Sequence, residues 1–356
     1  MSKRRSRKGG ALWVFALFAC LLSTSVAGED HKRVLHVYAW SNFFAPDVLA
    51  AFENAYNCTV AIDTFDSNEA MYEDVLAGGL YDIITPSAYM TAELNRAGLL
   101  MELDHRLLPN IEYVDRKFVQ LTEDKEMRHS VPYTRTVTGI GYNIDMFDGH
   151  AKSWSVFSRP EFAGRLAMLD DMRESLGAAL KYLGYSLNTR DAKAVIEAGR
   201  LLQDWKRNLA GFEVDESNIK LGAGKFVAVQ GYNGDLSLLM QTNNSIGFFV
   251  PQEGSAITTD DFVMLASSQE KALAHAFINH LLAPHVAAAN MSEILYYMPI
   301  PEALNLLNSE LRNSSAFMVP DDVLQNCEVI RDLGEDNELY FSVWEAVKNG
   351  GNFPAE

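Results

Sequence analysis

Between residues 34 and 90 the sequence alternates three times between a short apolar segment and a helical pattern, and this alternation constrains the fold more than any other feature. The apolar segments Val34–Tyr38, Thr59–Thr64 and Tyr81–Ile84 predict strands. Strands that alternate with helices are typical of an α/β protein with an open, mostly parallel sheet, in which ligands bind beyond the carboxyl ends of the strands. We therefore expect the residues that follow these strands to face one crevice: Trp40-Ser41, Ser67-Asn68-Glu69 and Ser87-Ala88-Tyr89.

The helices between these strands have clear sequence signals at their ends. Pro46 suits the first turn of a helix, where its missing amide hydrogen has no partner to lose. A second helix is expected over Asn68–Leu76, and Gly78-Gly79 ends it, because glycine readily adopts the left-handed conformation that closes a helix. A third helix is expected from about Ala88 to Arg96, before Gly98.

The chain has 356 residues, more than one ordinary domain, so two lobes are expected. Two or three chain crossings between the lobes would form a hinge, so that ligand binding can close the cleft. We expect 28–136 to form the first segment of lobe 1, 137–255 the main segment of lobe 2, 256–300 the return to lobe 1, and 301–356 a C-terminal helical segment that packs on the lobes. Beyond the β-rich Thr136–Asn143 we expect strands at Leu166–Leu169, Phe226–Val229, Ile246–Val250 and Asp261–Ala266, and helices from near Arg173, over Asp191–Arg207 and over Lys271–Leu282.

The N-terminus has the pattern of a secretory signal peptide. Five basic residues among the first eight precede an uncharged apolar run, Ala11–Leu22, and small residues favour cleavage after Ala27. The run is too short to cross a membrane comfortably. Residues 1–27 are therefore predicted to be removed on export to the periplasm. A second interpretation stays open, because Leu17-Phe18-Ala19-Cys20 resembles a loose lipobox that would leave Cys20 lipidated.

Charge and cysteine content restrict the function classes. The formal net charge is −17, and loss of the five basic residues of the signal peptide makes it about −22. Such a charge disfavours nucleic acid and anionic lipid as partners and favours cationic ligands. Cys58 and Cys327 remain after export, and they form either one disulfide or two buried thiols.

Several short segments occur in a fixed order along nearly the whole mature chain: Tyr38-Ala39-Trp40-Ser41, Thr64–Tyr72, Tyr81–Ser87, Val131-Pro132-Tyr133, Gly139–Asn143, Asp170–Glu174 and Pro251–Gly254. No one of them is specific alone, but their order and spacing resemble the periplasmic spermidine/putrescine-binding proteins of bacterial ABC transporters. The resemblance implies a two-lobed type II periplasmic binding protein fold with a polyamine held in the interlobe cleft. It also implies a monomer that delivers the ligand to a membrane ABC permease, with no cofactor and no catalysis.

The resemblance also assigns ligand-binding residues by position. Thr258 and Met298 stand where relatives place aromatic residues, so the preference among polyamines is more open than the ligand class. Phe43 replaces a usual Tyr and Tyr232 a usual Trp. The implied site consists of Trp40, Ser41, Phe43, Ser87 and Tyr89 from lobe 1, Asp171, Glu174, Tyr232 and Asp235 from lobe 2, and Asp260 as the anchor of a primary amine.

These residue types suit a polyamine, which carries an ammonium at each end of a flexible alkyl chain. Carboxylates replace the water around the ammonium groups, and ring faces cover the methylenes. Structural roles remain open for each group. Asp171 and Glu174 fit a helix N-cap and capping box, Asp260-Asp261 a solvated turn, Tyr232–Asp235 a turn, and Trp40 a core position.

Other functions are weaker candidates. A protein of the same fold could bind a basic amino acid or another amine, or act as a polyamine sensor that docks on a membrane receptor. A hydrolase is disfavoured because neither Gly-x-Ser-x-Gly nor a Walker motif occurs. His275, His280 and His285 recur every five residues and do not share a helical face, so no metal site is predicted.

Overall fold

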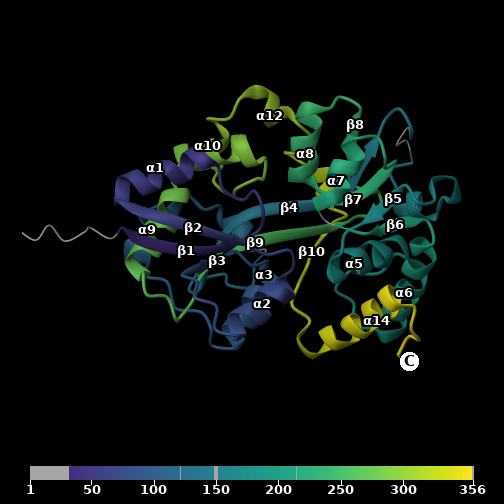
Figure 1. Ribbon diagram of the computed structural model, residues 1–356, viewed down its shortest axis with the longest axis horizontal. Helices are drawn as coiled ribbons and strands as arrows, with labels where there is room; N and C mark the ends of the chain where they lie inside the picture. Colours follow the sequence, from purple (N-terminus) through teal and green to yellow (C-terminus); the bar gives the residue numbers. More distant parts are fainter. Residues whose placement is uncertain (1–31, 121, 148–150, 214, 355–356) are drawn as a thin grey trace, which may run out of the picture. The chain divides into compact units, whose positions relative to one another are not determined.

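The computed structural model describes residues 32–120, 122–147, 151–213 and 215–354. The predicted signal peptide and Cys20 lie outside the described residues. Within the described ranges, no helix combines the length and the apolar character that a membrane crossing requires. Residues 33–356 form one structural unit, in which we distinguish two lobes (Figure 1).

Lobe 1 is built on the three predicted strand–helix units. Strand β1 (Arg33–Ala39) pairs in parallel with β2 (Cys58–Thr64) on one side and with β3 (Ile83–Ile84) on the other. The third strand is two residues shorter than the sequence predicts. Each strand leads into a helix: α1 (Pro46–Tyr56), α2 (Asn68–Leu76) and α3 (Ala88–Arg96).

Two long antiparallel strands connect the lobes. Residues 130–137 of β4 (Ser130–Asn143) pair with β9 (Ala256–Met264), which also pairs with β3 in lobe 1. Residues 138–143 of β4 pair with strands of lobe 2 (Figure 1). One strand therefore belongs to the sheets of both lobes.

Strand β9 corrects the sequence prediction. It begins at Ala256, five residues before the predicted Asp261, and all nine of its residues are buried. Asp260 and Asp261 therefore lie inside a central strand, and their interpretation as a solvated turn is wrong. Asp260 is tolerated there because two hydroxyl groups donate to it, from Thr134 on β4 and from Ser87 at the N-cap of α3.

Lobe 2 also contains parallel strand pairs, on the side of its sheet away from β4. Strand β5 (Leu166–Met168) pairs in parallel with β6 (Leu209–Phe212) and with β7 (Ala228–Tyr232), and β7 and β8 (Ile246–Phe249) pair antiparallel with β4. Aspartates cap two of its helices: Asp171 accepts from Glu174 N, and Asp191 from Lys193 N. The helices are α5 (Met172–Tyr182), α6 (Ala192–Lys206), α7 (Asp215–Gly222) and α8 (Asn233–Thr242).

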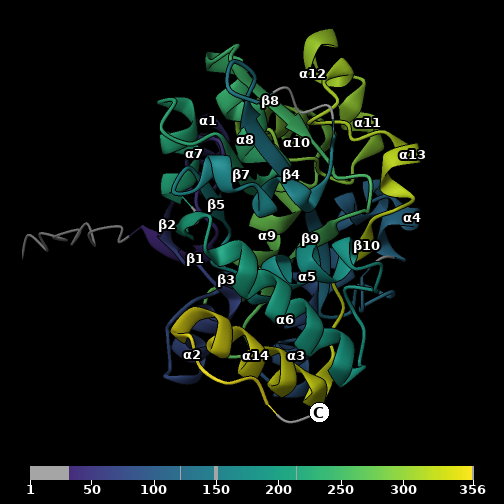
Figure 2. The same cartoon turned by 90° about the vertical axis from the view of Figure 1, so that its right-hand side faces the viewer.

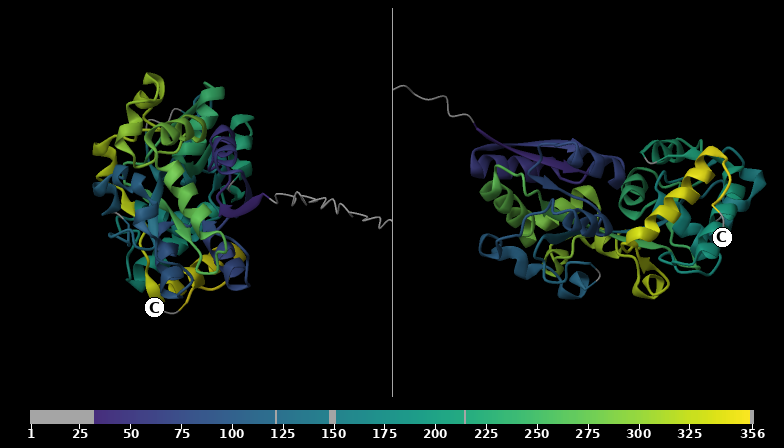
Figure 3. Two further views of the ribbon diagram at one scale, coloured as in Figure 1. Left: turned by 90° about the vertical axis from the view of Figure 1, so that its left-hand side faces the viewer. Right: turned by 90° about the horizontal axis from the view of Figure 1, so that it is seen from below.

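The remaining helices divide between the two lobes. Phe277 of α9 packs on Phe52 of α1 in lobe 1, with 5.0 Å between ring centroids. The C-terminal helix packs on α5 and α6 in lobe 2 (Figures 2 and 3). There the Trp344 ring contacts the Phe212 ring. These elements are α4 (Arg116–Val119), α9 (Lys271–Leu281), α10 (Pro284–Ile294), α11 (Pro301–Leu304), α12 (Ser309–Asn313), α13 (Asp321–Leu324), β10 (Glu328–Val329) and α14 (Asn337–Asn349).

The two cysteines are not joined. Cys58 is buried in the apolar core of lobe 1, whereas the Cys327 thiol lies 3.6 Å from the carbonyl oxygen of Val323. Of the two alternatives that the sequence leaves open, the structure has separate thiols, of which only Cys58 is fully buried.

Candidate ligand-binding site

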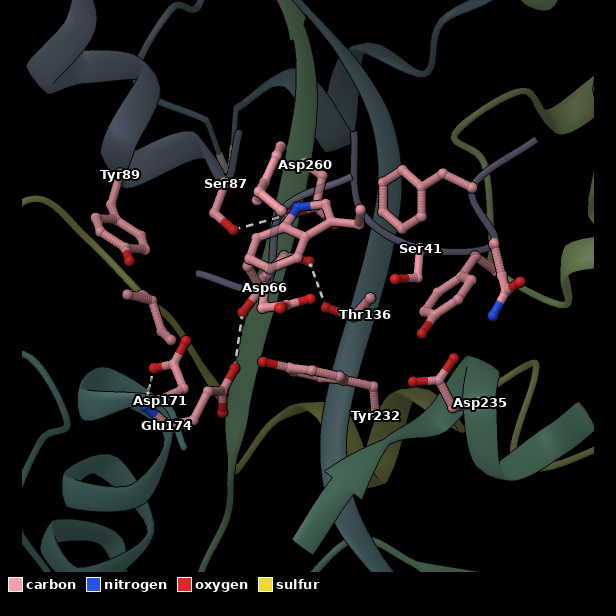
Figure 4. Close-up of a pocket in the computed structure, with 17 residues that line it drawn as sticks. Ser41, Asp66, Ser87, Tyr89, Thr136, Asp171, Glu174, Tyr232, Asp235 and Asp260 are labelled. Carbon is pink, nitrogen blue, oxygen red and sulfur yellow. Dashed lines mark hydrogen bonds between the residues drawn. The ribbon is translucent and has the colours of Figure 1, made fainter. Parts of the chain in front are cut away.

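All ten predicted ligand-binding residues line one pocket, which we call the interlobe pocket (Figure 4). It encloses about 790 Å³, part of it open to solvent, a volume within the range of small-molecule sites. Its lining residues are Trp40, Ser41, Asn42, Phe43, Phe65, Asp66, Ser87, Tyr89, Thr136, Asp171, Glu174, Tyr232, Asp235, Thr258, Asp260, Tyr296 and Ile330.

The lobe 1 wall forms at the carboxyl ends of the first three strands, as the sequence predicts. Trp40 follows β1 and packs on Phe65, which follows β2, with 4.4 Å between ring centroids. Asn68 at the start of α2 orients the residues that follow β3. Its side-chain amide donates to Ser87 Oγ (3.2 Å) and to the Tyr89 hydroxyl (3.1 Å) and accepts from Ser87 N (3.0 Å).

Asp260 lines the pocket from strand β9, next to Ser87 (Figure 4). Its Oδ1 accepts from Ser87 Oγ and its Oδ2 from Thr134 Oγ1, each at 2.9 Å. The carboxylate is 4% exposed, and this burial raises its pKa to about 7 even though the two hydroxyl donors oppose the shift. The group is therefore held in a fixed position, and a cation bound beside it would favour its deprotonated form.

Two more acids come from the start of helix α5. Asp171 caps the helix by accepting from Glu174 N (2.9 Å), and it also lines the pocket. The helix-cap role that the sequence left open for Asp171 therefore does not exclude a position in the site. Glu174 Oε1 accepts from Thr258 Oγ1 (3.0 Å), whereas its Oε2 is buried without a hydrogen-bond partner among the described residues. Burial and the charge of Asp171 raise the pKa of Glu174 to about 8, and burial raises that of Asp171.

The opposite end of the pocket is built by strand β7 and helix α8. Tyr232 ends β7, and Asp235 lies in the first turn of α8; the Asn233 side chain accepts from Val137 N (2.8 Å) and so fixes the turn between them. Gly234 lets Tyr296 approach, because a Cβ there would lie 2.5 Å from the Tyr296 ring. In Figure 4, Asp235 lies on one side of Tyr232, and Asp171 and Glu174 lie on the other.

The arrangement places carboxylates at both ends of a pocket with aromatic rings between them. Burial raises the pKa values of Tyr232 and Tyr296 well above the ordinary tyrosine value, so both phenols stay neutral. Among the described residues that line the pocket there is no lysine or arginine. Chemically, such a site suits an elongated cation and disfavours an anion.

A comparison with known protein families identifies the family of the chain. Residues 47–317 match the family model of bacterial extracellular solute-binding proteins. The chain belongs to this family. The prediction of a binding protein rather than an enzyme is thereby confirmed.

The curated relatives of this solute-binding protein are similar over almost their whole length. It is 29% identical to the spermidine/putrescine-binding periplasmic protein of Escherichia coli strain K12, over 95% of this chain and 98% of that protein. It is 30% identical to the putrescine-binding periplasmic protein PotF of the same strain, again over 95% and 98%.

Solved structures confirm the two-lobed α/β fold of the solute-binding protein. A putative spermidine/putrescine ABC transporter protein from Listeria monocytogenes superimposes with a TM-score of 0.85 at 30% identity, covering 89% of this chain and 99% of that one. The TpPotD lipoprotein of Treponema pallidum gives a TM-score of 0.81 at 30% identity, covering 89% and 99%.

Sequence reasoning missed several lining residues of the solute-binding protein. Phe65 and Asp66 directly precede the predicted crevice residue Ser67, so extending that rule by two positions would have found them. Met298, expected as the replacement of a site tyrosine, is buried in the lobe 1 core, and Tyr296 supplies the ring instead. No local signal identifies Ile330, because it reaches the pocket from the C-terminal segment.

A second, open depression of the solute-binding protein continues from the interlobe pocket, with Asp66 and Asp171 lining both. We call it the acidic groove. The Lys348 ammonium within it is engaged by both oxygens of Asp170, at 2.6 and 2.9 Å. Its other charged lining residues are Glu69, Glu213, Glu216 and Glu345.

Proposed function

We propose that this protein captures a polyamine, putrescine or spermidine, in the interlobe pocket and delivers it to a membrane ABC permease. The observation that carries the proposal is the placement of carboxylates at both ends of a pocket that aromatic rings line between them. The curated relatives named for spermidine and putrescine binding support the same ligand class.

The ligand contacts follow from the geometry. One terminal ammonium pairs with Asp171 and Glu174, whose Oε2 has no hydrogen-bond partner among the described residues, and the other pairs with Asp235. Pairing relieves the cost of the buried carboxylates, which is several kcal/mol for an unpaired ion. Rings that face an ammonium add about 0.5–2 kcal/mol each. Because micromolar affinity needs only roughly −8 kcal/mol, the pocket needs no further aromatic residue at Thr258.

Ligand binding would also hold the two lobes together. Trp40 and Tyr89 belong to lobe 1, whereas Glu174 and Tyr232 belong to lobe 2, and β4 and β9 are the strands that link them. A ligand that contacts both walls favours the closed arrangement by the free energy of those contacts.

We further propose the cellular setting that the sequence predicts. The protein is exported, acts as a monomer in the periplasm after loss of residues 1–27, and presents the loaded pocket to its permease. A lipid attached at Cys20 is the alternative form of the mature N-terminus. Mass spectrometry of the mature protein distinguishes the two, because only lipidation leaves an N-terminal Cys20 with added acyl mass.

Isothermal titration calorimetry tests the ligand proposal. The mature protein is titrated with putrescine, spermidine and spermine, and with lysine and arginine as cationic amino acids. We expect one-to-one binding of at least one polyamine with a Kd in the micromolar range or tighter. Absence of heat with every polyamine, or binding of an amino acid alone, would refute the proposal.

A further inference from the structure

Asn68 lies behind the interlobe pocket and holds two of the residues that line it. It is the first residue of α2, is 2% exposed and does not itself line the pocket. Its side-chain amide forms hydrogen bonds with Ser87 N (3.0 Å), Ser87 Oγ (3.2 Å) and the Tyr89 hydroxyl (3.1 Å). Any effect of Asn68 on a ligand therefore passes through its neighbours Ser87 and Tyr89.

The backbone amide of Ser87 fixes which way round the Asn68 amide lies. A backbone N–H group can only donate, so the atom of Asn68 that faces it must be the carbonyl oxygen Oδ1. The other end of the amide is then the NH₂ group, which can only donate. Both hydroxyl groups that this end contacts, those of Ser87 and Tyr89, must therefore accept.

Each of these hydroxyl groups directs its own hydrogen toward a carboxylate. A hydroxyl group that accepts from Asn68 keeps its one hydrogen for another partner. Ser87 Oγ donates that hydrogen to Asp260 Oδ1, at 2.9 Å. The Tyr89 hydroxyl faces Glu69 Oε1 at 3.4 Å, and burial keeps this phenol protonated by raising its pKa well above the ordinary value.

The two donated hydrogen bonds favour the charged forms of both carboxyl groups. Burial raises the pKa values of Asp260, which lines the interlobe pocket, and of Glu69, which lines the acidic groove. The Ser87 hydroxyl opposes this shift at Asp260, as the Tyr89 hydroxyl does at Glu69. If the hydroxyl groups turned toward an acceptor at position 68, each carboxyl group would lose that donor.

We infer that Asn68 is a positioning residue that directs the hydroxyl hydrogens of Ser87 and Tyr89 onto carboxylates and so keeps these carboxylates charged for a cation. This inference rests on the proposed polyamine-binding function. The substitution Asn68→Asp should reverse the direction, because an ionised carboxylate has the same shape as the amide but only accepts. It keeps the hydrogen bond from Ser87 N and attracts both hydroxyl hydrogens.

The pH dependence of polyamine affinity tests the inference. Calorimetric Kd values for putrescine and spermidine are measured from pH 6 to 8.5 for the wild type and Asn68→Asp, after circular dichroism confirms folding. The rise of affinity with pH should move upward by at least about one pH unit in the variant, because carboxyl groups that lose a donor ionise less readily. Asn68→Asp should then bind about fivefold more weakly at pH 7 and within about twofold of the wild type at pH 8.5. Equal weakening at every pH would show a purely structural role and overturn the inference.

A Ser87→Ala background separates the direction of the hydrogen from the charge that an aspartate adds. Without the Ser87 hydroxyl, Asn68 cannot reach Asp260, so Asn68→Asp should shift the pH dependence by less than half as much. A full shift in that background would show that the added charge acts alone and would overturn the inference. Asn54→Asp, on the exposed face of α1, adds the same charge away from the pocket and should leave the pH dependence unchanged.

A neutron crystal structure of the deuterated wild type tests the inference without a substitution, and it decides the matter if Asn68→Asp does not fold. We expect the Asn68 Nδ2 deuterons to point at Ser87 Oγ and the Tyr89 oxygen, and the Ser87 deuteron to point at Asp260. A Ser87 deuteron that points at Asn68 would overturn the inference. Failure of the wild type to bind any polyamine refutes the proposed function, whereas polyamine binding with an unshifted pH dependence in Asn68→Asp refutes the inference alone.

Discussion

Glu174 on helix α5 accepts a hydrogen bond from Thr258 on strand β9, with 3.0 Å between Oε1 and Oγ1 (Figure 4). This contact joins a helix of lobe 2 to a strand that pairs with the sheet of lobe 1. It orients the carboxylate with one oxygen satisfied and leaves Oε2 without a partner among the described residues. Glu174 is therefore pre-organised for a cation that enters between the lobes.

Substitution Glu174→Gln should weaken polyamine binding about tenfold or more, because loss of a hydrogen bond to a charged group costs about 1.5–3 kcal/mol. The glutamine side chain keeps the shape of the site and can still accept from Thr258. Calorimetry measures the change, with Glu338→Gln on the exposed face of α14 as the matched control. Equal Kd values for Glu174→Gln and the wild type would remove Glu174 from the site.

Polyamine affinity should rise with pH between about 6 and 8. Burial raises the pKa of Glu174 to about 8 and that of Asp260 to about 7, so both carboxyl groups are partly protonated in the empty pocket at neutral pH. The positive charge of a bound polyamine favours the deprotonated form of both groups, and binding therefore releases protons. Polyamines stay charged in this range because alkyl ammonium groups titrate near pH 10.

Titrations in buffers of different ionisation enthalpy measure the proton release directly. We expect a net release at pH 7 that becomes smaller in Glu174→Gln. An affinity that stays constant from pH 6 to 8, without proton release, would contradict the assignment of these carboxyl groups to the ligand.

Asp235 should be required for recognition of the second ammonium of a diamine. Asp235→Asn removes the charge at one end only, so putrescine should bind at least about tenfold more weakly, whereas a monoamine such as butylamine can still use the Asp171–Glu174 end. Competition titrations compare the two ligands in the variant and the wild type. A loss of equal size for both ligands would show that Asp235 acts on the whole pocket and not on one ammonium.

Asp261 should make the unliganded protein less stable as the pH rises. Burial raises its pKa from 3.8 to about 8, so its neutral form fits the fold. Folding favours the protonated form of a group whose pKa is raised in the folded state. The stabilising contribution of protonated Asp261 is therefore complete below about pH 4 and is lost as the pH rises through 8. The free energy of unfolding of the wild type should fall between pH 5 and 8. In Asp261→Asn this fall should be at least about 1 kcal/mol smaller than in the wild type.

Urea denaturation at several pH values measures this difference in the absence of ligand. Glu338→Gln again provides the control, because its side chain is exposed on α14. A variant Asp261→Asn with the same pH dependence as the wild type would show that Asp261 ionises without cost in the folded protein.

Much of the fold follows from local patterns in the sequence. The strand–helix alternation after Val34 predicts three parallel units, and the structure contains them with boundaries that differ by at most two residues. The rule that ligands bind at the carboxyl ends of parallel strands places Trp40, Ser87 and Tyr89 at one crevice, where the structure has them. Each of these predictions depends on neighbours in the sequence.

Long-range pairing is what the sequence does not reveal. Strand β9 consists of Ala256–Met264 because β3 and β4 pair with it from both sides. Its polar residues Thr258–Asp261 are therefore buried, although the local sequence left a solvated turn open for Asp260-Asp261. The same holds for Arg173. Its sequence neighbours predict only the start of a helix, whereas Tyr89, Tyr340 and the Arg331 carbonyl contact it from distant parts of the chain.

A crystal structure of the protein with putrescine tests the central claim most directly. We predict one ammonium within hydrogen-bond distance of Glu174 Oε2 and Asp171, the other at Asp235, and the methylene chain between Trp40 and Tyr232. Putrescine bound outside the interlobe pocket, or an anion held between these carboxylates, would contradict the account.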